Sequence, residues 1–155
     1  TWSSIASNLL HLATHDDDRQ RLVAEPELIP TAVEEFLRAY SPVTMARVAA
    51  EDTEIAGCPV MAGDKVFLPF GASNRDPEMF DRPEEVIIDR EENRHFAFGI
   101  GIHRCLGSNL ARMELVVAME EWLKRFPEFS LATDSEVQWG GTQVRGPRSV
   151  PVRVT

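Results

Sequence analysis

The chain has 155 residues, a formal net charge of −9, and 43% hydrophobic residues. Such an acidic chain lacks the basic surface that general nucleic-acid binding requires. Two cysteines are too few for a secreted disulfide framework, and no apolar run reaches the roughly 20 residues of a membrane span. The chain starts at Thr1 rather than Met, inside a predicted helix. We therefore expect a piece of a longer, cytoplasmic protein.

Three helices are predicted before Pro42. In the first, Ile5, Leu9 and Leu12 recur at helical spacing on a wide apolar face, which predicts burial on several sides. The second is short and begins near Asp16, where a run of aspartates supplies N-cap candidates. The third follows Pro30, because proline suits the first turn of a helix.

Strands and loops are predicted after the third helix. Residues 44–70 mix β-branched and aromatic residues with turn signals, which predicts a small antiparallel sheet. Residues 71–95 predict a long irregular segment. The longest helix is predicted over 106–126, and strand-like pieces occupy 129–154. One apolar face of that helix holds Leu106, Leu110, Met113 and Val117, and another holds Val116, Met119, Leu123 and Phe126. The predicted fold class is mainly α with small antiparallel β-sheets (α+β).

Cys105 lies just before the longest predicted helix, in the sequence FAFGIGIHRCLG. Unpaired N–H groups and the positive end of a helix dipole favour the thiolate, the form of cysteine that binds metal. Gly101 and Gly107 allow a tight turn and the close approach of a flat ligand, and Phe98 offers an apolar wall. A lone cysteine is more often a small buried hydrophobe, but these four positions together favour a ligand loop.

This segment resembles the haem-ligand loop of the cytochrome P450 family, whose pattern is Phe-x-x-Gly-x-x-x-Cys-x-Gly. The resemblance implies haem b as the cofactor, with Cys105 as the axial thiolate and metal ligand. His103 and Arg47 match positions that often contact a haem propionate in bacterial members. The alternative for each is a surface residue. The full set of implied haem-binding residues is Cys105, Phe98, Gly99, His103, Arg47, Gly107 and Ala111.

Glu35 and Arg38 lie three residues apart on the third predicted helix, so their side chains share one face. Such pairs are usually solvated. Ahead of a cysteine loop, this one resembles the structural Glu-x-x-Arg pair of the same family. The family commonly adds an arginine from the irregular segment, but Glu85 and Val86 stand where Arg and Phe are common. Either the network is weaker here or another arginine takes that role. The candidates are Arg82, Arg90 and Arg94.

The resemblance covers nearly the whole chain and implies that residues 1–155 are the C-terminal portion of a single cytochrome P450 domain. In chain order this portion comprises the end of the I helix, the K helix, a small β-sheet, the meander, the cysteine-ligand loop, the L helix and a C-terminal β region. Thr1 then lies beside the family's oxygen-activating acid–alcohol pair. The catalytic residues themselves would lie upstream, and they stay unknown.

The implied function is that of a haem-thiolate monooxygenase, which inserts one oxygen atom from O2 into a small hydrophobic substrate. Electrons would come indirectly from NAD(P)H, through a ferredoxin and its reductase or through a fused reductase domain. Arg104 and Arg112 flank the ligand and are candidates for steering an acidic partner, or else are solvated. Candidate substrate contacts are Val43, Thr44, Met45 and the turn at Gly140 and Gly141.

Three other hypotheses stay open. A peroxide-driven haem peroxygenase would keep the haem site but replace the upstream acid–alcohol pair. A truncated fragment would bind haem poorly or lack activity. Finally, Cys105 would serve as a nucleophile assisted by His103, although no orienting group or oxyanion site is recognisable in the sequence.

Overall fold

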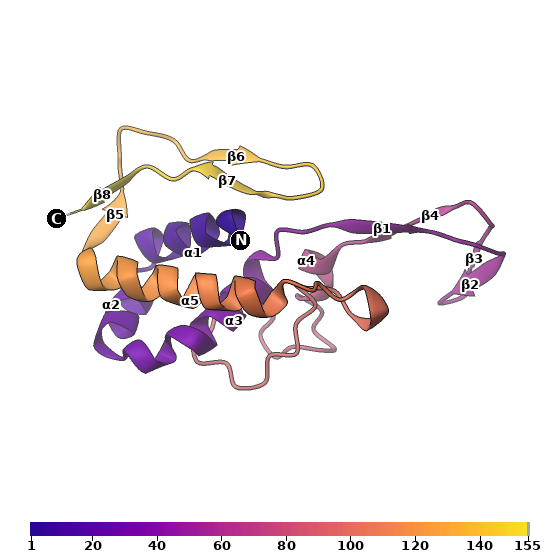
Figure 1. The fold of residues 1–155 in the computed structure, drawn as a ribbon, viewed down its shortest axis with the longest axis horizontal. Helices are drawn as coiled ribbons and strands as arrows, with labels where there is room; N and C mark the ends of the chain where they lie inside the picture. The colour runs from indigo at the N-terminus through magenta and orange to yellow at the C-terminus, as the bar shows by residue number, and fades with distance from the viewer. Residues whose placement is uncertain (155) are drawn as a thin grey trace.

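The computed structural model describes residues 1–154, which form a helical body with strands along its side and a long arm (Figure 1). It contains helices and small antiparallel sheets, which confirms the predicted α+β class. None of the helices in residues 1–154 is both long and apolar enough to span a bilayer. The helices are α1 (Trp2–Thr14), α2 (Asp16–Ala24), α3 (Ile29–Tyr40), α4 (Phe70–Ser73) and α5 (Ser108–Arg125), with 3-10 turns η1 (Pro26–Leu28) and η2 (Gly101–His103).

The core lies where α1, α3 and α5 pack together, with α2 at one end (Figure 1). Leu12 of α1, Phe36 of α3 and Met119 of α5 are all buried there. Helix α1 also buries polar residues, among them Ser4, which its apolar spacing did not predict. The N-cap of α2 is His15 rather than one of the aspartates. The three aspartates occupy the first turn of this helix, where the positive end of the helix dipole stabilises them.

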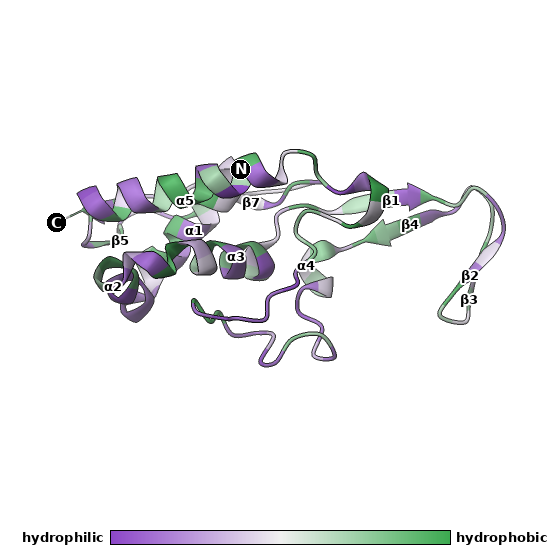
Figure 2. Ribbon diagram, turned by 60° about the horizontal axis from the view of Figure 1, so that its bottom comes forward, coloured by the Kyte–Doolittle hydropathy of each residue, from purple (hydrophilic) through white to green (hydrophobic). Residues whose placement is uncertain are grey.

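The predicted sheet over 44–70 is two separate two-stranded pairings. Strand β1 (Met45–Val48) pairs antiparallel with β4 (Lys65–Leu68), and β2 (Thr53–Ile55) pairs with β3 (Cys58–Val60). Together they form an arm that extends away from the helices, and the view in Figure 2 shows the same extension. The base of this arm adjoins the cysteine loop, as the cavity described below shows.

The C-terminal strands lie along α1. Strand β5 (Phe129–Leu131) pairs with β8 (Val152–Val154), and β6 (Gln138–Gly140) pairs with β7 (Gly146–Ser149). A Cβ at Gly146 would lie 2.8 Å from the Cβ of Ser3, so glycine permits the close approach of β7 to α1. A further bridge joins Val43 to Val144, which ties the β6–β7 turn to the segment after α3.

Of the two apolar rows that the sequence predicts on α5, the one that contains Met119 and Leu123 faces the core. Leu115, Met119 and Leu123 are buried. Apolar residues occupy two sides of this helix, and only its packing against α3 and α1 decides which side is covered. The four residues of the other row are each at least half exposed: Leu106 at 102%, Leu110 at 55%, Met113 at 58% and Val117 at 50%.

The irregular segment between α4 and the cysteine loop is held by a buried ion pair. Glu35 and Arg38 are both 0% exposed and bond in a bidentate manner, from Nε at 2.8 Å and from Nη2 at 2.8 Å. The remaining donors of Arg38 reach the backbone carbonyls of Asn74, Pro83 and Glu85 at 2.7–2.8 Å. These bonds replace the backbone ladder that an irregular segment lacks.

Arg90 completes this network. Its Nε donates to Glu35 at 3.0 Å, and its Nη1 donates to the carbonyl of Asp81 at 2.7 Å. Of the three arginine candidates, the structure therefore places Arg90 beside the pair. The side chain of Asn93 also donates to Glu35, at 3.0 Å.

Asn74 connects α3 to the start of the cysteine loop. Its Nδ2 donates to the Ser41 hydroxyl at 2.6 Å, and its Oδ1 accepts the backbone N–H of Phe96 at 2.6 Å. Asn74 is 0% exposed, so both bonds are made in the interior, where an unpaired polar group would be costly.

We expect Arg38→Met to cost about 3–5 kcal/mol of folding free energy, because it leaves the Glu35 carboxylate buried without its main partner. Urea denaturation of the protein that carries this chain measures the loss. The matched control is Arg125→Met, which breaks an exposed pair with Glu121 on α5 and should change stability little. Equal losses in the two variants would contradict the structural role of the Arg38 network.

A second polar cluster joins the first three helices. His11 is 2% exposed; its Nδ1 lies 2.6 Å from the Tyr40 hydroxyl and its Nε2 lies 2.7 Å from Asp18. Burial raises the pKa of Tyr40 to about 12, so that hydroxyl keeps its proton to donate. A neutral His11 with its proton on Nε2 satisfies both partners. This fits the expectation that His11 is a packing residue.

Burial lowers the pKa of His11 below its ordinary value of 6.5, an effect that the hydrogen bond to Asp18 opposes and the neighbouring His15 reinforces. The unfolded chain therefore takes up this proton at higher pH than the folded chain. The contribution of neutral His11 to folding stability should be complete above pH 6.5. It should be lost as the pH falls through the lowered pKa of His11. The free energy of unfolding, measured across this pH range, should change less steeply with pH for His11→Gln than for the parent. Identical slopes would refute the lowered pKa of His11.

Candidate functional site

The cysteine loop is a compact turn that ends at α5. The N–H of Cys105 donates to the carbonyl of Phe98 at 2.9 Å, which closes the loop on itself. Gly99 and Gly101 have φ angles of +69° and +67°, in the left-handed region that favours glycine. The N–H of Ser108, at the first turn of α5, donates to the carbonyl of Cys105 at 3.3 Å. The predicted setting, a glycine-containing loop that leads into a helix, is therefore present.

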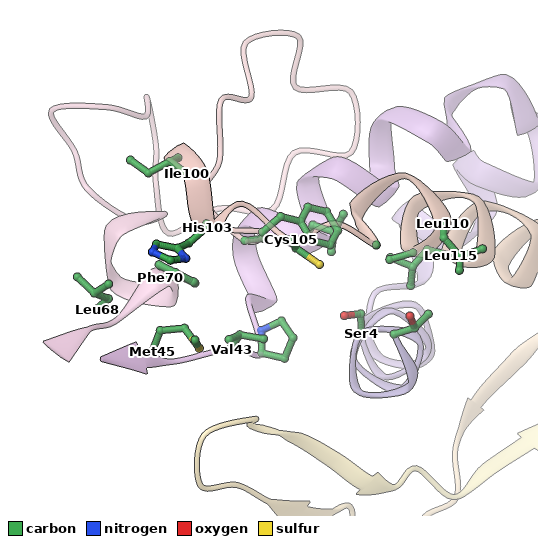
Figure 3. Close-up of a pocket in the computed structure, with 18 of the residues that line it drawn as sticks. Ser4, Val43, Met45, Leu68, Phe70, Ile100, His103, Cys105, Leu110 and Leu115 are labelled. Carbon is green, nitrogen blue, oxygen red and sulfur yellow. The ribbon is translucent and has the colours of Figure 1, made fainter. Parts of the chain in front are cut away.

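The side chain of Cys105 is exposed and faces a cavity of about 590 Å³. In Figure 3 its sulfur projects from the loop into this cavity, with Val43 and Ser4 on the opposite side. The volume lies within the usual range of about 300–1,000 Å³ for small-molecule and cofactor sites. A buried structural cysteine would not present its sulfur in this way.

Several helices and strands contribute side chains to the cavity wall. On α5, one face at helical spacing carries Leu110, Ala111, Glu114 and Leu115. On β1, Met45 and Arg47 alternate inward, and Leu68 of β4 is paired with Met45. Phe70 of α4 and residues at the start of α1 close the remaining sides. The wall is therefore mostly apolar, with a few polar groups at defined places.

Comparison with known proteins identifies the family. The model of the cytochrome P450 family matches residues 9–138. The polyketide biosynthesis cytochrome P450 PksS of Bacillus subtilis is 43% identical over 159 residues, which cover 100% of this chain and 39% of that protein. The chain belongs to the cytochrome P450 family. The steroid C26-monooxygenase of Mycolicibacterium smegmatis is 41% identical over 157 residues, again covering 100% of this chain and 39% of that protein.

Solved cytochrome P450 structures match the chain closely. The structure of PksS superposes with a TM-score of 0.94 at 43% identity, covering 99% of this chain and 40% of the other. CYP109E1 from Bacillus megaterium, in complex with testosterone, also gives a TM-score of 0.94, at 36% identity, covering 98% and 43% of the two chains. The chain thus spans about two-fifths of the length of the relatives that it matches.

The residues present fit the haem that the family implies. The sulfur of Cys105 is exposed at the wall of a largely apolar cavity, and glycines without side chains lie near it on the same wall. A Cβ added at Gly107 would lie 4.0 Å from the sulfur of Cys105, and one added at Gly99 would lie 3.5 Å from the ring of Phe70. Glycine at these two positions leaves room for a flat macrocycle beside the sulfur.

Most of the residues expected at the site line this cavity, and some do not. The expected residues on its wall are Thr1, Val43, Met45, Arg47, Phe98, Gly99, His103, Cys105, Gly107 and Ala111. Thr44 is outside the lining set, and its N–H donates to the carbonyl of Gln143 at 2.9 Å. Gly140 and Gly141 line a separate hollow at the β6–β7 turn. Within residues 1–154, the cysteine sulfur that makes a hydrogen bond is that of Cys58, to the carbonyl of Pro59, and none joins Cys105 to His103, so that part of the nucleophile hypothesis lacks geometric support.

Arg112 is placed differently from expectation. Its guanidinium donates to both oxygens of Glu34, at 2.6 and 2.9 Å, and lies 4.7 Å from the centre of the Phe98 ring. An arginine held in this way is not a solvated cation available to a partner. Arg104, by contrast, is exposed on the cysteine loop.

Sequence reasoning missed several wall residues, including Ser4, Phe70, Leu110 and Glu114. Two of these carried a usable signal, since Leu110 and Glu114 follow Gly107, the N-cap of α5, by three and seven residues, which is helical spacing. Ser4 and Phe70 come from distant segments, and only the packing of α1 and α4 brings them to the cysteine loop.

We expect Gly99→Ala to cost about 1–2 kcal/mol, because a left-handed φ is unfavourable for a residue with a Cβ. It should also weaken haem retention, since the added methyl points toward Phe70 on the cavity wall. Gly63→Ala is the matched control: its φ is +92°, and its added Cβ would meet no atom within 4 Å. It should show a similar loss of stability with haem retention unchanged. Equal haem retention in both variants would refute the assignment of Gly99 to the haem wall.

Proposed function

We propose that the protein carrying this chain is a haem-thiolate monooxygenase, in which Cys105 is the axial ligand of haem b. The observation that carries this proposal is the exposed sulfur of Cys105, directed into a cavity of about 590 Å³ and located ahead of the first turn of α5. Membership of the cytochrome P450 family supports it.

The residues of this chain would bind and orient the cofactor. Cys105 would hold it through its sulfur as the thiolate, the form of cysteine that binds metal. Phe98 would pack beside the sulfur and limit water there. His103 and Arg47 line the same cavity with N–H donors suited to the haem carboxylates. When bound, the haem would supply the activation of O2 and the insertion of one oxygen atom into the substrate.

The substrate is proposed to be a small hydrophobic organic molecule. Val43 and Met45 lie on the cavity wall, and both are apolar. One similar protein is named as a steroid C26-monooxygenase, and another is described in complex with testosterone. An apolar wall favours such ligands because their burial removes apolar surface from water. Thr1, on the same wall, is proposed to lie next to the oxygen-activating residues rather than to be one of them.

Electrons are proposed to come indirectly from NAD(P)H, through a ferredoxin with its reductase or through a fused reductase domain. Arg104 is exposed beside the ligand, where it would attract an acidic donor. We also propose a cytoplasmic location for this protein.

The test is a difference spectrum of the reduced, carbon-monoxide-bound protein that contains this chain. The parent should show the red-shifted band of thiolate ligation, and Cys105→Ser should lose it, because a serine hydroxyl is a poor substitute for the thiolate. Cys58→Ser is the matched control; Cys58 is exposed on the distant arm, and the variant should keep the band. A parent without the band, or a Cys105→Ser variant that retains it, would refute the proposal.

A further inference from the structure

Two neighbouring carboxylates on α3 bind different parts of the molecule. Glu35 is fully buried and bonds to Arg38, Arg90 and Asn93, as described above. Glu34 is partly exposed and turns toward the cysteine loop and α5. Consecutive residues of a helix point about 100° apart, so one helix can serve both regions.

Glu34 accepts hydrogen bonds from two elements. Its Oε1 accepts Nε of Arg112 at 2.6 Å, and its Oε2 accepts Nη2 of Arg112 at 2.9 Å. Its Oε2 also accepts Nε2 of His95 at 3.0 Å. Burial by itself would raise the pKa of Glu34, but the hydrogen bonds from His95 and Arg112 outweigh it and lower that pKa to about 2. Glu34 is therefore a carboxylate at any pH near neutrality.

The tautomer of His95 follows from its second contact. The backbone N–H of Ala97 donates to Nδ1 of His95 at 3.2 Å, so Nδ1 is the acceptor. The proton of the neutral ring is then on Nε2, where it is donated to Glu34. His95 thus ties the start of the cysteine loop to α3, and its side chain is only 2% exposed.

Arg112 ties the other end of the loop to the same carboxylate. It lies on α5, seven residues after Cys105, and its guanidinium covers the ring of Phe98 at 4.7 Å. The carbonyl of Phe98 in turn accepts the N–H of Cys105 at 2.9 Å. The contacts therefore form a closed ring from Glu34 through His95 and the loop to Cys105, and back through α5 and Arg112.

We propose that Glu34, His95 and Arg112 act together as a positioning network, here called the Glu34 clamp, which holds the sulfur of Cys105 in place for haem ligation. This inference rests on the proposed function and extends it. None of the three residues lines the cavity, so they act through Phe98 and the loop backbone rather than by touching the haem. The clamp is distinct from the Arg38 network, since the two share no side chain.

The test uses Glu34→Gln, which keeps the shape but removes the charge, and Arg112→Lys, which keeps the charge but removes the planar fork. Both are made in the haem-loaded protein that contains this chain. Two quantities are measured: the fraction of the reduced carbon-monoxide complex that shows the thiolate band, and the rate of haem transfer to an excess of a haem-scavenging protein. The matched control is Glu121→Gln, which breaks the exposed ion pair with Arg125 on α5, the helix that carries Arg112.

In both clamp variants we expect part of the thiolate band to be replaced by a band at shorter wavelength, and haem to be lost on the order of tenfold faster. Glu121→Gln should match the parent. The double variant should be no worse than the more affected single variant, because the residues act as one unit. Clamp variants that match the parent in both quantities would overturn the inference. So would loss of helical circular dichroism in both clamp variants, because a positioning role requires that the fold persists.

The outcomes separate the clamp from the function on which it rests. If the parent lacks the thiolate band, or Cys105→Ser retains it, the haem-thiolate proposal fails and the clamp fails with it. If the parent has the band and Cys105→Ser loses it, while both clamp variants are unchanged, only the clamp is overturned.

Discussion

A fully buried guanidinium holds the irregular half of this chain in place. Arg38 uses all five of its N–H donors, two on the Glu35 carboxylate and three on backbone carbonyls between residues 74 and 85. The irregular segment has no strand or helix to pair its carbonyls, so a rigid, permanently charged fork takes that place. Removing the fork would take from the buried Glu35 carboxylate its bidentate partner and from three backbone carbonyls a charged donor, which is why so much of the structure depends on one side chain.

Helix α3 organises the molecule because it carries charges on more than one of its faces. Glu35 and Arg38 face the irregular segment, and Glu34 faces the cysteine loop and α5. The same helix contributes Phe36 to the core and Leu37 to the cavity wall. Displacement of α3 would therefore disturb the core, the irregular segment and the position of Cys105 together.

The candidate haem site combines local and distant contributions. The loop supplies the sulfur and the glycines, α5 supplies a row of side chains at helical spacing, and β1 and β4 supply side chains at strand spacing. Most of this wall is apolar, and its polar groups are few and separately placed. Such a combination favours a large apolar ligand with charged ends, and it agrees with membership of the cytochrome P450 family.

The amino-acid sequence alone determined what depends on spacing within one segment. The cysteine loop with its glycines, the helix that follows it and the three-residue spacing of Glu35 and Arg38 can all be read without a structure, because neighbours on one helix or turn are set by backbone geometry. These features were sufficient to predict the fold class and the family.

Only the tertiary structure decided what depends on contacts between segments. It placed Arg90 beside Glu35, 55 residues away in the chain, and it brought Ser4 to the cavity. It also paired Arg112 with Glu34, whereas the sequence left Arg112 open between a docking cation and a solvated residue. It also decided which of two apolar sides of α5 is buried. The physical reason is the same in each case: packing of whole elements sets these distances, and a local pattern compatible with several packings carries no information on which one forms.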